Sequence, residues 1–90
     1  MPFYVVLWHS KDSRENGVDL VHAKDKREAR RRYRGSHYSP IDAVLSQAEE
    51  RQRAISDGLN PDTDSLFADI SQDEYNRAEH GEVVNVESGT

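Results

Sequence analysis

The sequence has no cysteine, which excludes disulfide bonds and thiolate metal sites. Its five glycines are scattered, so the chain has no glycine-rich loop for binding phosphate. The longest apolar run, Phe3–Trp8, is too short to span a bilayer and lacks the flanking pattern of a signal peptide. From these absences we expect a cytoplasmic protein without a membrane anchor.

Motifs for catalysis and for metal binding are also missing. His9 and His22 are expected to come close across a hairpin, but no third ligand follows at a recognisable spacing. The acidic residues of the C-terminal half lack the glycine and the terminal glutamate of a calcium-binding loop. Ser36 and His37 are adjacent, but nothing in the sequence orients them as a nucleophile and its base. We therefore expect no catalytic residue, no metal site and no cofactor.

The residues that are present suffice for one small domain. The chain has 90 residues, of which 34% are hydrophobic and 32% charged, with a mean hydropathy of −0.94. This is polar for a globular protein, but aromatic residues make up 8% of the chain, too many for a disordered tail. We expect a single domain with a thin core over residues 1–86 and a flexible tail over residues 87–90.

Charge is divided unevenly along the chain. The net charge is −5, but residues 1–36 hold nine Lys and Arg against five acids (+4), and residues 37–90 hold three against twelve (−9). One interpretation is that the acidic half neutralises the basic half within the fold. The other is that the basic half serves a partner.

The N-terminal pattern predicts a β-hairpin. Phe3–His9 is β-branched and aromatic on both faces, which is typical of a central strand covered on both sides. Residues 10–17 form a turn cluster in which Asn16 and Gly17 favour positive φ. Residues 18–23 are the expected return strand.

The next element predicted is a long helix in the middle of the chain, over residues 40–57. Ser39 has the properties of an N-cap, and Pro40 suits the first helical position because its missing N–H costs nothing there. Apolar residues then recur with a 3.6-residue period. On the polar face we expect an ion pair between Glu49 and Arg53.

The C-terminal part predicts a third helix and a short strand. Ser71 and Glu74 have the spacing of a capping box, and Ile70 with Tyr75 has the spacing of a hydrophobic staple. Residues 83–86 are apolar enough to add a third strand to the hairpin.

Together these patterns predict an α+β fold, in which the N-terminal hairpin and a short C-terminal strand pack against three helices. The expected core comprises Tyr4, Val6, Trp8, Val21, Ala29, Tyr33, Val44, Leu45, Ala48, Ile55, Phe67, Ile70 and Tyr75.

The most distinctive stretch is a basic helix over residues 25–34, entered through an expected capping box of Asp25 and Glu28. Ala29 and Tyr33 form its apolar stripe, and four arginines lie on the opposite face at about 100° per residue. The candidate partner-binding residues are Arg27, Arg30, Arg31 and Arg34, with Lys24 and Lys26 beside them.

Three uses of this basic face are open. It can bind an acidic surface of a protein partner. It can bind nucleic acid through phosphate contacts, with Tyr33 and Tyr38 stacking on bases, although no established nucleic-acid-binding motif is present and the chain is acidic overall. It can also be a merely solvated surface. Self-association is open as well.

One resemblance bears on these alternatives. Residues 18–33, VDLVHAKDKREARRRY, contain the pattern V-x-A-x-D-x-x-E-A where a strand enters a capped helix. Residues 3–34 thereby resemble small hairpin-plus-helix accessory proteins of bacteriophages and mobile elements. The resemblance implies a protein that binds a host protein or blocks a host defence, and it assigns no role to any single residue.

Overall fold

The computed structural model describes residues 1–86, so the flexible tail expected at residues 87–90 lies outside the described residues. Along the chain the elements are β1 (Phe3–His9), β2 (Asn16–His22), α1 (Lys26–Arg34), β3 (Ile41–Ser46), α2 (Gln47–Ser56), α3 (Gln72–Glu79) and β4 (Val84–Val86). The predicted α+β class is confirmed, including the N-terminal hairpin and the short C-terminal strand.

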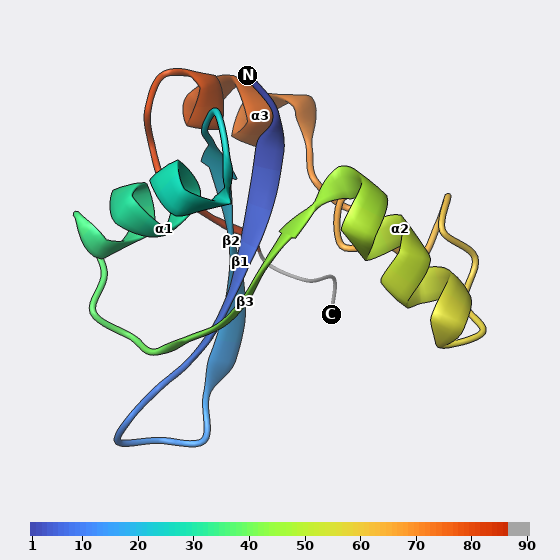
Figure 1. The fold of residues 1–90 in the computed structure, drawn as a ribbon, viewed down its shortest axis with the longest axis horizontal. Helices are drawn as coiled ribbons and strands as arrows, with labels where there is room; N and C mark the ends of the chain where they lie inside the picture. Colours follow the sequence, from blue (N-terminus) through green and yellow to red (C-terminus); the bar gives the residue numbers. More distant parts are fainter. Residues whose placement is uncertain (87–90) are drawn as a thin grey trace.

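The four strands form one antiparallel sheet in the order β3-β1-β2-β4 (Figure 1). β1 is central, because it pairs with β2 on one side and with β3 on the other. β4 pairs with β2 and places Asn85 opposite Asp19. The outer strands of the sheet are therefore β3 and β4.

Helices α1 and α3 cover opposite faces of this sheet (Figure 1). Tyr4 and Val6 of β1 pack on the side of α1, whereas Val5 packs on the side of α3. Because successive side chains of a strand point to opposite faces, a strand covered on both sides must be apolar throughout. The expectation of a doubly covered β1 is confirmed.

Gly17 has a different role from the one predicted. It does not adopt positive φ, and with Asn16 it belongs to β2 instead of a turn. Gly17 lies opposite Trp8 in the register, and a Cβ atom there would lie 2.3 Å from Cζ2 of the Trp8 ring. The missing side chain therefore makes room for the indole.

The long helix predicted over residues 40–57 is wrong in its first half. Residues 41–46 form β3, and the N-cap of the helix that follows is Ser46, not Ser39. The Ser46 hydroxyl accepts from the N–H of Glu49, and the Glu49 carboxylate accepts from the N–H of Ser46. The apolar residues of this stretch suit a strand as well as a helix, and pairing with β1 decides the outcome.

The ion pair predicted between Glu49 and Arg53 is also wrong. Arg53 instead donates to Glu50 through Nε and Nη2, and to Asp57 at 2.8 Å. Glu50 is fully buried, and its carboxylate also accepts the backbone N–H of Leu66 at 3.1 Å. The face of α2 expected to be solvated thus packs against the loop that follows it.

Most of the predicted core is buried, with two clear errors. Ala48 and Ile55 are exposed, because they depended on the face assigned to the longer helix. Four other expected members are only half-buried: Trp8, Leu45, Phe67 and Tyr75. The capping box of Ser71 with Glu74 is confirmed, and Ile70 and Tyr75 pack into the same cluster on the α3 face.

The two histidines expected to meet across the hairpin do not. His9 lies opposite Asn16, and His22 lies opposite Phe3 at the other end of the pair of strands. The hairpin loop is shorter than the turn predicted over residues 10–17, because β2 begins at Asn16. The strands therefore pair in a different register from the one that would bring the two histidines together.

Candidate functional site

Helix α1 is fixed at its start and along one side. The Asp25 carboxylate accepts from the N–H of Glu28 at 2.8 Å, so the predicted N-cap is confirmed. The Glu28 carboxylate accepts from the N–H of Lys24 and not from that of the cap. This hydrogen bond is the main cause that lowers the pKa of Glu28 below its ordinary value. Ala29 and Tyr33 are fully buried against the sheet.

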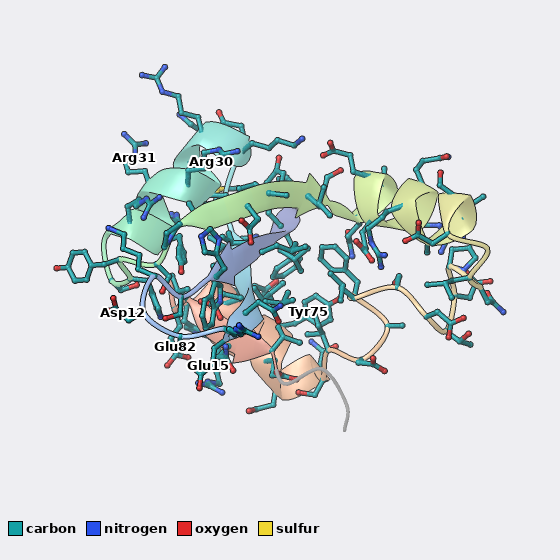
Figure 2. The ribbon with its side chains drawn as sticks, turned by 90° about the horizontal axis from the view of Figure 1, so that it is seen from below. Asp12, Glu15, Arg30, Arg31, Tyr75 and Glu82 are labelled. Atoms are coloured by element: carbon teal, nitrogen blue, oxygen red, sulfur yellow. The ribbon has the colours of Figure 1, made fainter. Side chains whose placement is uncertain are left out.

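The opposite side of α1 presents the predicted arginines to solvent. Arg27 and Arg30 are exposed and, within residues 1–86, form no ion pair. The guanidinium of Arg31 lies 3.9 Å from the Glu28 carboxylate, and its side chain is 75% exposed. Arg31 projects from α1 away from the sheet (Figure 2). Three cations are thus displayed on one rigid helix.

The other predicted site residues are partly engaged. Arg34 donates from Nη1 to the backbone carbonyl of Ser39 at 3.0 Å. The Lys26 ammonium pairs with the Glu49 carboxylate, and this contact lowers the pKa of Glu49. Lys24 is exposed. All six predicted residues therefore lie on α1 or just before it, but the ammonium of Lys26 is paired with Glu49.

The acidic half does not cover this basic face. Its own arginines pair within that half: Arg51 pairs with Asp62, and Arg77 pairs with Glu82. Across the described part of the chain, Lys26 with Glu49 is the single Lys or Arg pair that joins the two halves. The acidic half thus neutralises one lysine of the basic half, Lys26, and none of the four candidate arginines.

A buried polar cluster lies below α1 and was missed from the sequence. Asp19 is 1% exposed, and its Oδ1 accepts from the side-chain amide of Asn85 at 2.9 Å. Its Oδ2, the hydroxyl of Tyr33 and the indole N–H of Trp8 are buried and have no hydrogen-bond partner among residues 1–86. A single acid inside the apolar strand pattern VDLV was the available signal.

His37 closes this cluster toward the surface. Its ring packs on the ring of Tyr33, and its Nδ1 lies 2.7 Å from the hydroxyl of Ser36. The expectation that nothing orients His37 is therefore wrong. Its Nε2 is 3.8 Å from Asp19, beyond hydrogen-bond range, so a continuous relay from acid to histidine to serine is not formed.

Other sites are scarce in the described residues. Within residues 1–86, no group of three or more His, Asp or Glu side chains could hold a metal ion. None of the helices in this part of the chain is long and apolar enough to cross a membrane. Tyr38 is 86% exposed, but Tyr33 is buried and cannot stack on a base.

Comparison with protein families, with curated proteins and with solved structures finds no match to this chain.

Proposed function

We propose that this is a non-enzymatic binding protein whose α1 face docks on an acidic surface of a partner protein. The observation that carries the proposal is that, within residues 1–86, Arg27 and Arg30 have no carboxylate partner, although the chain has an excess of acids. Each guanidinium has five N–H donors and suits carboxylates in a fixed geometry.

Several features favour a protein over nucleic acid. Helix α1 has nine residues and is about 13 Å long, which limits how many phosphates it can follow. The net charge of −5 repels an extended polyanion beyond that length. Burial of Tyr33 removes one of the two expected stacking platforms. Nucleic acid is the second candidate, because Tyr38 is exposed just after the arginines.

The resemblance of residues 3–34 to phage and mobile-element accessory proteins supports an accessory or inhibitory role, including interference with a host defence. A small protein with an exposed charged face suits that role, because inhibition requires only occupation of a surface.

The test compares two variants of equal charge. One carries Arg27, Arg30, Arg31 and Arg34 changed to Glu; the matched control carries Lys11, Arg14, Arg51 and Arg77 changed to Glu. Each reversal changes the charge by two units, so four of them take both variants from −5 to −13. Tagged wild type and both variants are used to capture partners from a bacterial lysate, with and without nuclease.

We expect a protein that is retained after nuclease by the wild type and by the control, and lost by the α1 variant. A partner that disappears after nuclease would favour nucleic acid. A partner retained by the α1 variant would remove this face from the function. Circular dichroism checks that both variants are folded, which we expect for the α1 variant because all four arginine side chains are exposed.

A further inference from the structure

Within residues 1–86, no strand pairs with the outer side of β3. The hydrogen bonds of β1 show which backbone groups of β3 point to that open side. The N–H of His9 donates toward β3, to the carbonyl of Pro40, whereas the carbonyl of Pro2 accepts from Ala23, which continues β2. Backbone groups alternate sides along a strand, so the odd-numbered residues of β1 bond β3. Their β3 partners point inward, and the backbone groups of Val44 point outward.

Val44 is the centre of this open edge. The neighbouring outward N–H, that of Ser46, is occupied by the Glu49 carboxylate of the capping box. At the other end, Asp42 is the extra residue of a β-bulge, and its carboxylate contacts His9 at 2.7 Å. Bulges and charges protect edges from pairing. Within the described residues, the Val44 N–H and carbonyl have neither kind of protection.

Helix α1 runs along the same edge. Lys26, Arg30 and Arg34 are spaced by four residues and share one side of the helix. Lys26 contacts Glu49, just after β3, and Arg34 contacts Ser39, just before it. Arg30 lies between these two contacts, and its guanidinium forms no ion pair within residues 1–86. A cationic row therefore borders the free backbone groups of Val44.

We propose that the partner adds an extended acidic segment to the β3 edge, pairing with Val44 while its carboxylates contact Arg30 and Arg27. This inference rests on the proposed function and names the binding mode. Backbone pairing supplies affinity, and side chains on one face supply specificity. Nucleic acid has no alternating amide and carbonyl groups that could pair with the edge.

A second copy of the chain fits the edge less well. Two β3 strands pairing antiparallel are related by a two-fold axis perpendicular to the sheet, which leaves both α1 helices on the same face. The two arginine rows would then approach each other across the join. Charge complementarity favours an acidic occupant.

The test measures amide hydrogen exchange by NMR while an eight-residue peptide of alternating Val and Glu is added. In the free protein, the Val44 amide should exchange much faster than those of Ala43 and Leu45, which bond β1. The peptide should slow Val44 exchange at least tenfold. Matched controls are the Val–Lys peptide and the Val–Glu peptide with alternate backbone amides methylated; neither should slow it.

Other outcomes overturn the inference in distinguishable ways. If the acidic peptide shifts only α1 signals and leaves Val44 exchange unchanged, strand addition is wrong but the proposed function stands. If Val44 is protected in the free protein in step with a dimer, a second copy occupies the edge. If the acidic peptide does not bind at millimolar concentration, strand addition is wrong, and the capture experiment alone decides the proposed function.

Discussion

At the scale of single residues, the close fit between Gly17 and Trp8 constrains the hairpin. The indole lies over the one position of β2 that has no side chain, and a Cβ there would be 2.3 Å from the ring. We expect Gly17→Ala to destabilise the protein by about 2 kcal/mol, because added volume forces the ring from its position. Urea unfolding measures the change.

A double-mutant cycle provides the control. In the Trp8→Ala background the clash is absent, so Gly17→Ala should cost less than about 0.5 kcal/mol. An equal cost in both backgrounds would show that the glycine serves the backbone and not the indole.

At the scale of elements, Ser46 marks the boundary between β3 and α2, because it is the last residue of the strand and the N-cap of the helix. Ser46→Ala removes the N-cap of α2 and should cost about 1 kcal/mol. Ser39→Ala should cost less than about 0.5 kcal/mol, since Ser39 caps no helix and its carbonyl, which accepts from Arg34, is kept in the variant. The reverse order in thermal or urea unfolding would restore the longer helix predicted from the sequence.

Helix α2 lies beside the sheet and is held by a buried carboxylate (Figure 1). Glu50→Ala leaves the N–H of Leu66 without its acceptor and should cost about 2 kcal/mol. Glu50→Gln keeps an acceptor oxygen and should cost less. Hydrogen exchange should quicken in α2 and in residues 58–70, while β1 stays protected. Uniform quickening would show instead that α2 and the sheet unfold as one unit.

How much the sequence predicts depends on how local each interaction is. The hairpin, the cap at Asp25 and the box at Ser71 were predictable because their partners lie within a few positions. β3 was not, because its apolar pattern suits two structures and only pairing with β1 selects one. The cluster around Asp19 depends on His37 and Asn85, which only the tertiary fold brings near. The exposed arginines followed directly from helical spacing.

At the scale of the whole molecule, stability should form a plateau between about pH 5 and about pH 9. Hydrogen bonds lower the pKa of Glu28 and of Glu49, so their stabilisation is present above the unfolded pKa and lost as acid protonates them. Burial raises the pKa of Tyr33 and of Tyr75, so the folded state loses stability as alkali ionises them. Urea midpoints across pH measure both limits.

Two variants assign these limits. Glu49→Gln should flatten the acid limb, and Tyr33→Phe should flatten the alkaline limb. An alkaline loss that persists unchanged when both Tyr33 and Tyr75 are replaced by Phe would contradict the assignment to these phenols.

The pairing of β2 with β4 has a consequence for the order in which the chain folds. Asp19 and Asn85 are 66 positions apart, whereas β1, β2, α1 and β3 follow one another. Local contacts form before distant ones, because closing a long loop costs entropy first. Until β4 and α3 pack, the sheet has a second open edge, at β2, and its face carrying Val5 and Leu20 is exposed. Crowded refolding chains will therefore join through these surfaces, so the recovered yield falls as concentration rises.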